Sequence, residues 1–287
     1  MTVAGERAID PTDWGASLQG LAWARYRAPD GPDLTEANET LALLLNHRSV
    51  RAYLPDALPA GTIETLVAAA QSASSSSNLQ VWSVVAVQDP ERKARLAALA
   101  GAQKHIVEAP LLLVWLIDFD RLSQLANDRG VPDEALDYLE TFLLGAVDTS
   151  LAAQNAVTAL ESLGLGAVYV GGIRNRPAEV AAELDLPPRM FPLFGLVVGK
   201  PDPARPASIK PRLPQASILF HETYAWTSAQ REAARRYDER LRSFQREQGM
   251  TERDWTEQAG DRTRGPESMA GRHILRSVLS GLGFELR

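Results

Sequence analysis

The sequence contains no cysteine. This absence excludes a disulfide framework, a thiolate zinc site, an iron–sulfur cluster and a cysteine nucleophile. Lysine is scarce, with four residues in 287, whereas arginine is common. The 30 basic and 36 acidic residues leave a net charge of −6, which argues against a broad basic face for nucleic acid.

Long uncharged apolar runs are also missing. The most apolar stretch, about residues 135–165, is interrupted by Asp137, Glu140, Asp148 and Glu161. It therefore lacks the ~18 uncharged residues that a membrane-spanning helix needs. The first 15 residues contain no apolar core of a secretory signal. We expect a cytoplasmic protein with no membrane partner.

The pattern of apolar residues predicts both strands and helices. Continuous apolar runs at 81–87, 111–117, 167–170 and 193–198 indicate short strands that are covered on both faces. Helices are expected over 35–46 with Thr35 as the N-cap, over 61–72 with Thr62 as the N-cap, and over 90–99. Residues 14–27 are a further candidate helix, and 229–248 predict a charged amphipathic one.

The strongest helix signal covers residues 133–163. Pro132 and Asp133 begin it and Gly164 ends it. At ~1.5 Å per residue such a helix would exceed about 40 Å in length. It is apolar nearly all round, which is typical of a helix buried in a large core or an oligomer interface. We therefore expect an obligate dimer.

Two short segments gather cations. His47, Arg48, Ser49 and Arg51 fall within five residues, and alternate side chains share a face if this stretch is extended. In the segment 210–214, two prolines fix an extended backbone and direct Lys210 and Arg212 to one side. Either pair of cations could bind a phosphate. A solvated basic turn and a stiff surface linker are the alternatives.

Two further segments are rich in small or polar residues. Residues 74–78 read Ser-Ser-Ser-Ser-Asn, which suits either a flexible loop or a loop that lies against a planar polar ligand. Tyr169, Val170, Gly171 and Gly172 end a predicted strand, where glycine allows close approach of a ligand or simply a turn. The motifs GxGxxG, HExxH, GxSxG and Walker A are missing, and the four histidines are scattered, so we expect no metal.

Six blocks, taken in order, resemble one family. They are NHRSVRAY (46–53), SASSSSNLQ (72–80), GAQKHIVEAP (101–110), residues 143–175, PLFGLVVGKP (192–201) and KPRLPQASILFHE (210–222). Together they are similar to the nitroreductase family of FMN-dependent enzymes. The branch they resemble contains the oxygen-insensitive NADPH nitroreductases and the NADPH–FMN oxidoreductases.

The resemblance implies an architecture. The fold would be α+β, with a nitroreductase-like mixed sheet flanked by helices, in an intertwined homodimer with FMN at the subunit interface. Residues 1–45 would be an N-terminal extension. Residues 46–287 would form the FMN-binding domain with a helical C-terminal arm.

The resemblance also implies the site. The FMN phosphate and ribityl chain would be held by His47, Arg48, Ser49, Arg51, Lys210 and Arg212. The flavin ring would contact Ser75, Ser76, Ser77, Gln103 and the turn Tyr169, Val170, Gly171 and Gly172. Arg51 would tune the flavin electrostatically. Arg246 and Arg253 are candidates for the NADPH 2′-phosphate, but Gln248 stands where relatives carry an arginine, so NADH is also possible.

The implied activity is FMN-dependent oxidation of NAD(P)H with reduction of nitroaromatics, quinones or similar small acceptors. The implied cycle is a ping-pong two-electron mechanism in which FMN carries the hydride chemistry and no side chain is catalytic. Two alternatives stay open at this point. One is an NAD(P)H:FMN reductase that supplies reduced flavin to a partner, and the other is a non-enzymatic flavin-binding dimer.

Overall fold

The computed structural model describes residues 14–28 and 31–287, which form two compact units. Unit 1 comprises Met1–Arg48 and Ser208–Ser268, and unit 2 comprises Ser49–Ala207 and Met269–Arg287. Unit 1 contains helices α1 (Trp14–Tyr26), α2 (Glu39–Leu45), α9 (Ser228–Glu247) and α10 (Trp255–Thr263). The predicted extension 1–45 falls in unit 1, with residues 1–13 and 29–30 outside the described part, and its boundary stays a prediction.

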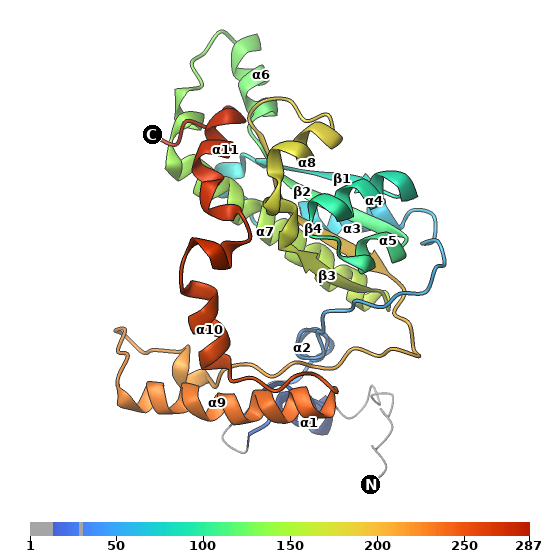
Figure 1. The fold of residues 1–287 in the computed structure, drawn as a ribbon, viewed down its shortest axis with the longest axis vertical. Helices are drawn as coiled ribbons and strands as arrows, with labels where there is room; N and C mark the ends of the chain where they lie inside the picture. The colour runs from blue at the N-terminus through green and yellow to red at the C-terminus, as the bar shows by residue number, and fades with distance from the viewer. Residues whose placement is uncertain (1–13, 29–30) are drawn as a thin grey trace. The chain divides into compact units, whose positions relative to one another are not determined.

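Unit 2 is built on a four-stranded sheet in the order β1-β2-β4-β3 (Figure 1). The strands are β1 (Trp82–Val87), β2 (Leu111–Asp118), β3 (Gly166–Val170) and β4 (Met190–Gly199), close to the four predicted ranges. All three strand pairs are antiparallel. Within the described chain, parallel pairing is limited to an isolated bridge between Ser49 and Ala167. The α+β class is confirmed, and the mixed character of the sheet rests on that one bridge.

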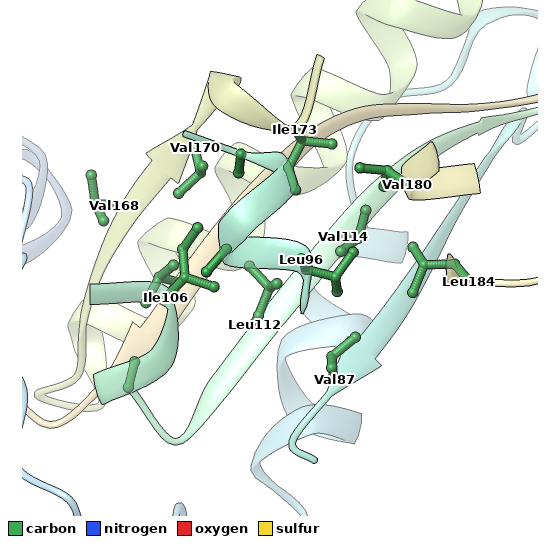
Figure 2. Packing of buried hydrophobic residues seen from close by; sticks show 14 of the residues in the cluster. Val87, Leu96, Ile106, Leu112, Val114, Val168, Val170, Ile173, Val180 and Leu184 are labelled. Carbon is green, nitrogen blue, oxygen red and sulfur yellow. The ribbon is translucent and has the colours of Figure 1, made fainter. Parts of the chain in front are cut away.

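Helices cover both faces of this sheet, as the apolar strands predicted. In β2, Leu112, Val114 and Leu116 face one core cluster, to which α4 (Pro90–Leu99), α5 (Lys104–Glu108) and α8 (Pro177–Glu183) contribute (Figure 2). The alternate β2 residues face a second cluster with α3 (Thr62–Gln71) and α7 (Leu139–Ser162). The remaining helices of unit 2 are α6 (Asp120–Asp128) and α11 (Leu275–Gly281). No described helix is long and apolar enough to cross a membrane.

The long predicted helix is shorter than expected. Residues Glu134–Asp137 form a separate 3₁₀ turn, and Tyr138 is extended (φ −95°, ψ 147°) before α7 begins. At this break the Arg287 N–H donates to the Asp137 carbonyl (2.9 Å), and the Leu139 N–H donates to the Arg287 carbonyl (3.2 Å). The prediction of one helix over 133–163 was wrong because a distant segment takes these backbone groups.

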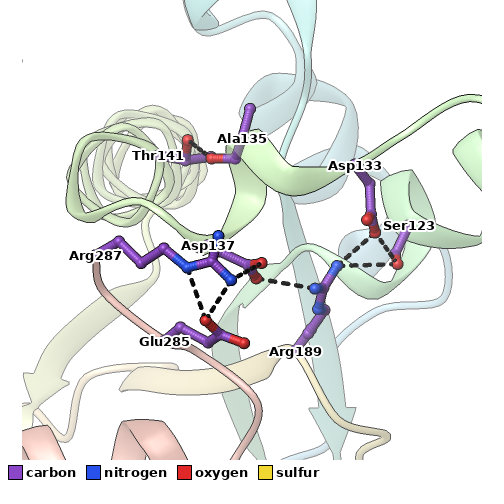
Figure 3. A network of polar contacts seen from close by, with 8 residues as sticks. All are labelled: Ser123, Asp133, Ala135, Asp137, Thr141, Arg189, Glu285 and Arg287. Carbon is purple, nitrogen blue, oxygen red and sulfur yellow. Dashed lines mark hydrogen bonds and ion pairs between the residues drawn. The ribbon is translucent and has the colours of Figure 1, made fainter.

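A polar network holds the same region together (Figure 3). Arg189 donates to Asp133 (2.5 Å) and to Asp137 (2.9 Å), and the Arg287 guanidinium lies 3.7 Å from Asp137. Ser123 also donates to Asp133 (2.5 Å). Asp137 is buried, so these cations stabilise a carboxylate that would otherwise be costly to bury.

Two predicted N-caps were wrong. Asn38, rather than Thr35, caps α2, because its Oδ1 accepts the Leu41 N–H (2.9 Å). Thr62 is the first residue of α3 itself and is buried, so it is not the cap. Gly61, with φ 81°, occupies the N-cap position. A turn in which the Thr62 N–H bonds to the Pro59 carbonyl (3.2 Å) favours glycine at 61. The helices predicted over 14–27, 90–99 and 229–248 are confirmed as α1, α4 and α9.

Candidate functional site

Residues 49–53 are held in place by hydrogen bonds from their buried side. Ser49 and Arg51 are exposed, whereas Val50 and Tyr53 are buried. The Tyr53 hydroxyl donates to the Val50 carbonyl (2.5 Å), and the Val50 N–H donates to Ala167 on β3 (2.9 Å). Ser49 and Arg51 are therefore both on the exposed side, as the alternation predicted, whereas His47, predicted to share this face, is only half exposed. His47 and Arg48, both half-buried, belong to unit 1.

The second cation segment has the same alternation. Lys210 and Arg212 are exposed, while Pro211 and Pro214 are buried. Tyr237 of α9 donates from its hydroxyl to the Pro211 carbonyl (2.8 Å), and this bond is buried. The backbone of this segment is thus held against unit 1 while its two cations point away from the buried side.

One side chain connects the two cation segments of unit 1. The Arg25 guanidinium donates to the Lys210 carbonyl (3.0 Å) and to the His47 carbonyl (2.5 Å). His47 and Lys210 are therefore within reach of a single arginine, although 163 positions separate them in the chain. The sequence offered no signal for Arg25, because its partners are backbone atoms far away along the chain.

The serine loop is held by a buried carboxylate. Asp148 of α7, 2% exposed, accepts the Ser75 hydroxyl (2.7 Å) and the Ser76 N–H (3.1 Å). The Ser75 oxygen in turn accepts the Gln80 N–H (2.9 Å). The Ser75 hydroxyl therefore orders the loop, and the side chains of Ser76 and Ser77 are exposed. In the sequence, the feature that could have pointed to a structural role for Asp148 is a carboxylate within an apolar stretch, because a buried carboxylate needs hydrogen-bond partners.

The same loop has a strained backbone. Ser77, Asn78 and Gln80 lie in the left-handed region, with φ of 51°, 55° and 51°. Residues other than glycine rarely adopt this conformation, and each costs on the order of 1–3 kcal/mol. Three such residues within four positions are maintained only because the surrounding contacts hold them. Strain of this kind clusters at ligand-binding sites.

The glycine turn and the Gln103 segment lie against each other. The Gln103 side-chain amide donates to the Ala100 carbonyl (2.9 Å). A Cβ at Gly172 would overlap that same carbonyl oxygen and would lie 2.7 Å from Gln103 Nε2. Tyr169 packs edge-on against Phe194, with ring centroids 5.2 Å apart. The structure thus brings Gln103 and Gly172 together, and only glycine fits at position 172.

Two buried polar atoms nearby lack partners. Within residues 14–28 and 31–287, neither His105 Nε2 nor Asn175 Oδ1 has a hydrogen-bond partner. Burial lowers the pKa of the His105 imidazole, and the positive charge of Arg51 lowers it further. Arg51 is therefore within electrostatic reach of the segment that carries Gln103. Buried polar atoms without a protein partner can be satisfied by a bound polar ligand or by an ordered water.

The two NADPH candidates are engaged in ion pairs. Arg246 pairs with Glu252 (2.8 Å), and Arg253 pairs with Glu257 (3.0 Å) and Asp261 (2.6 Å). Both arginines are substantially exposed. To bind the phosphate of NADPH, each arginine would have to release its carboxylate partners. In the described ranges, no three His, Asp or Glu side chains gather as a metal ion requires.

Comparisons with known proteins define the family. The model of the nitroreductase family matches residues 44–200, and that of the nitroreductase family C-terminal domain matches residues 210–287. The chain belongs to the nitroreductase family, as the six sequence blocks predicted.

Individual relatives agree with this assignment. The chain is 40% identical over 225 residues to an FMN reductase (NADPH) of Bacillus subtilis, which covers 77% of this chain and 90% of the relative. It is 41% identical over 220 residues to an oxygen-insensitive NADPH nitroreductase of Salmonella typhimurium, covering 76% and 88%.

Solved structures show the same fold. The hypothetical oxidoreductase YcnD of Bacillus subtilis superposes with a TM-score of 0.82 at 34% identity, covering 87% of this chain and 99% of that one. The NADPH:FMN oxidoreductase of Vibrio harveyi, solved with NAD+, gives a TM-score of 0.77 at 33% identity, covering 87% and 100%.

Proposed function

We propose that this protein is an FMN-dependent NAD(P)H oxidoreductase that reduces nitroaromatics, quinones or similar small acceptors. The observation that carries the proposal is the identity of 40–41%, over about three quarters of the chain, to relatives named FMN reductase (NADPH) and oxygen-insensitive NADPH nitroreductase. Small molecules are the proposed substrates, and the net charge of −6 argues against nucleic acid. We place the activity in the cytoplasm.

The proposed ligands of the FMN phosphate and ribityl chain are basic side chains and one serine hydroxyl on constrained backbones. They are His47, Arg48, Ser49, Arg51, Lys210 and Arg212. Arginine donates paired, charge-assisted hydrogen bonds that match the oxygens of a phosphate. The alternating burial around Ser49–Arg51 and Lys210–Arg212 supports this assignment, because it leaves the cationic side chains accessible.

The proposed ring contacts come from the serine loop, Gln103 and the glycine turn. The residues are Ser75, Ser76, Ser77, Gln103, Tyr169, Val170, Gly171 and Gly172. When bound, FMN supplies the two-electron redox chemistry between NAD(P)H and the acceptor. The chain supplies position through the Asp148-held loop and the close packing at Gly172. Arg51 supplies positive charge beside the ring, and no side chain is assigned a proton transfer.

We also propose a homodimer formed through α7. Leu139, Leu143, Val147 and Leu151 recur every four residues and are 44–56% exposed, so they form one apolar stripe. The stripe spans about 18 Å along the helix. A second copy of this chain is the proposed occupant, because a two-fold axis lets one stripe pack against an identical one.

A second candidate function is favoured by one observation. Two relatives are named FMN reductase, the second at 38% identity over 223 residues. On this reading the protein reduces free FMN and supplies it to a partner enzyme. Steady-state kinetics separate the two functions: saturable turnover of free FMN with poor turnover of nitroaromatics would favour the second.

The test of the proposed function begins with the visible spectrum of the purified protein. A flavin spectrum is expected, bleached anaerobically by NADPH or NADH, and the more effective nucleotide defines the preference. A colourless protein that FMN cannot reconstitute would contradict the proposal. The variant Arg51→Ala should lower FMN affinity or turnover by about tenfold. Arg129→Ala, which removes an exposed arginine at the end of α6, is the matched control.

A further inference from the structure

Arg25 is a buried cation that lies outside the ranges matched by the family models. It is 7% exposed and is the penultimate residue of α1, whereas the matches cover 44–200 and 210–287. Its Nη1 donates to the Lys210 carbonyl (3.0 Å). Its Nη2 donates to the carbonyls of Leu45 (2.9 Å) and His47 (2.5 Å). One guanidinium therefore fastens three backbone carbonyls from two distant segments.

The main chain of Arg25 adds a fourth bond. The Arg25 carbonyl, near the end of α1, accepts the Arg212 N–H (2.9 Å). This bond satisfies one of the carbonyls that a helix leaves unpaired at its C-terminus. Together with the Tyr237 bond to Pro211, three successive residues from 210 to 212 each have a fixed backbone group.

The effect of these four bonds falls on the phosphate-binding side chains that the same residues carry. His47 and Lys210 are fixed at their own carbonyls, Arg212 at its own N–H, and Arg48 is covalently attached to His47. The side chains therefore project from a backbone that is already in place. Fixing ligands before binding removes an ordering cost from the affinity for an anion.

Electrostatics explain why a buried arginine suits this task. Lys210 and Arg212 carry positive charges only two residues apart, and like charges repel each other, so a fixed backbone is needed to keep both on one segment. The Arg25 side chain bonds to carbonyl oxygens, the negative ends of peptide dipoles, and so holds the backbone of both segments. The additional positive charge also favours binding of an anion.

We propose that Arg25 is a positioning residue for the phosphate of FMN, so that the segment preceding the family match builds part of the cofactor site. This inference rests on the proposed function. Arg25 acts through His47, Arg48, Lys210 and Arg212 and does not itself need to touch the phosphate. Its loss should weaken the binding of flavins that carry the phosphate more than the binding of flavins that lack it.

The experiment compares two ligands that differ by the phosphate. Apoprotein is titrated with FMN and with riboflavin, and the dissociation constants are read from flavin fluorescence. Arg25→Met should weaken FMN binding by about tenfold or more while the constant for riboflavin stays within about twofold. A general loss of fold would weaken both ligands alike. The FMN-to-riboflavin affinity ratio therefore isolates positioning from stability.

Two further variants complete the test. Arg27→Met is the matched control, because it removes a nearby guanidinium that pairs with Glu247 of α9 (2.6 Å) instead of with the cation segments. Its affinity ratio should equal that of the wild type. If Arg25→Met does not fold, Arg25→Lys decides: one ammonium cannot occupy the positions of both Nη1 and Nη2, so the same selective loss is expected.

The outcomes separate this inference from the proposed function. If wild-type protein binds FMN and both Arg25 variants keep its FMN-to-riboflavin ratio, the positioning role is wrong and the proposed function stands. If the wild type binds neither flavin, the proposed function itself has failed. A selective loss of FMN affinity in Arg25→Met or Arg25→Lys, but not in Arg27→Met, supports the inference.

Discussion

At the scale of the residue, Gly172 shows how closely the glycine turn packs against the segment that carries Gln103. The space beside its Cα is taken by the Ala100 carbonyl and the Gln103 amide, which are hydrogen-bonded to each other. A methyl group there must displace backbone or break that bond. Such a change would displace Gln103, which is proposed to contact the flavin ring.

We therefore expect Gly172→Ala to lose about 1–3 kcal/mol of unfolding free energy and to bind FMN more weakly. Gly260→Ala in α10 is the control, because its added methyl meets nothing within 4 Å. It should be neutral or slightly stabilising. Urea unfolding and FMN titration measure both effects. Equal stability of the two variants would contradict the packing argument.

Asp133 gives a residue-scale prediction that depends on pH. The Ser123 hydroxyl bond, followed by the nearby Arg189, holds the pKa of the Asp133 carboxyl below its ordinary value of 3.8. A depressed pKa adds stability above the unfolded pKa, and this stability is lost as pH falls through the folded value. Asp133→Asn should cost about 1 kcal/mol at pH 7, and the difference should shrink below about pH 4.

Urea unfolding across this pH range tests the prediction. Ser123→Ala removes the largest cause of the shift, so an NMR titration should find the Asp133 pKa higher in that variant than in the wild type. A gap between Asp133→Asn and wild type that stays constant down to pH 3 would show that the carboxylate charge is not what matters.

At the scale of the element, α7 presents two different apolar faces. Ala152, Ala156 and Leu160 are fully buried in the core cluster beneath the sheet. The stripe from Leu139 to Leu151 faces away from that core, and exposed stripes of this kind mark interaction sites. One face of α7 therefore packs in the core of unit 2, and the other forms the proposed dimer interface.

We expect Val147→Lys to shift a wild-type dimer towards monomer, because it places a charge within the stripe. Leu125→Lys on α6 is the matched control, since Leu125 is 54% exposed and Val147 56%, but Leu125 lies off the stripe. Light scattering after size-exclusion chromatography measures the mass. A wild-type monomer at micromolar concentration would rule out the proposed dimer.

At the scale of the whole molecule, each unit combines segments from distant parts of the sequence. Residues 208–268 belong with the first 48, and the last 19 belong with the sheet. The proposed FMN ligands are correspondingly scattered along the chain, from His47 to Arg212. Binding of a ligand to the native state alone stabilises that state as a whole.

FMN should therefore raise the melting temperature of the apoprotein. At a concentration one hundred times the dissociation constant, the gain is about 2.7 kcal/mol. Riboflavin at the same concentration should stabilise less, because it cannot engage the phosphate ligands. Differential scanning fluorimetry suits riboflavin and FMN poorly because both fluoresce, so circular dichroism is the appropriate measurement. Identical shifts for the two flavins would argue against a phosphate subsite.

Much of the fold was predictable because its signals are local. The four apolar runs gave the strands, and the Leu112–Trp115 stretch is apolar on both sides because both faces of β2 are buried. The break at Tyr138 was not predictable, since it depends on Arg287, 149 positions later in the chain. Thr35 and Asn38 are both residue types that cap helices, and the structure uses Asn38, the stronger type.

The residues of the candidate site also divide into those that the sequence could locate and those that it could not. Motif blocks located the cations and the glycine turn, because these residues are close together in sequence. The residues that hold the segments of the site, Arg25, Asp148 and Tyr237, make side-chain contacts 20 to 185 positions away along the chain. A backbone carbonyl is present at every position, so no residue type at the acceptor marks such a bond.

The bond between Arg25 and Lys210 has a consequence for biosynthesis. A ribosome adds roughly 5–20 residues per second, so roughly 10–40 s separate the synthesis of these two partners. A nascent chain that has not yet reached residue 210 carries only the first group of cations. If Lys210 and Arg212 bind the phosphate as proposed, the flavin site is complete only after residue 212 has been synthesised, so cofactor uptake is expected late in synthesis or after it.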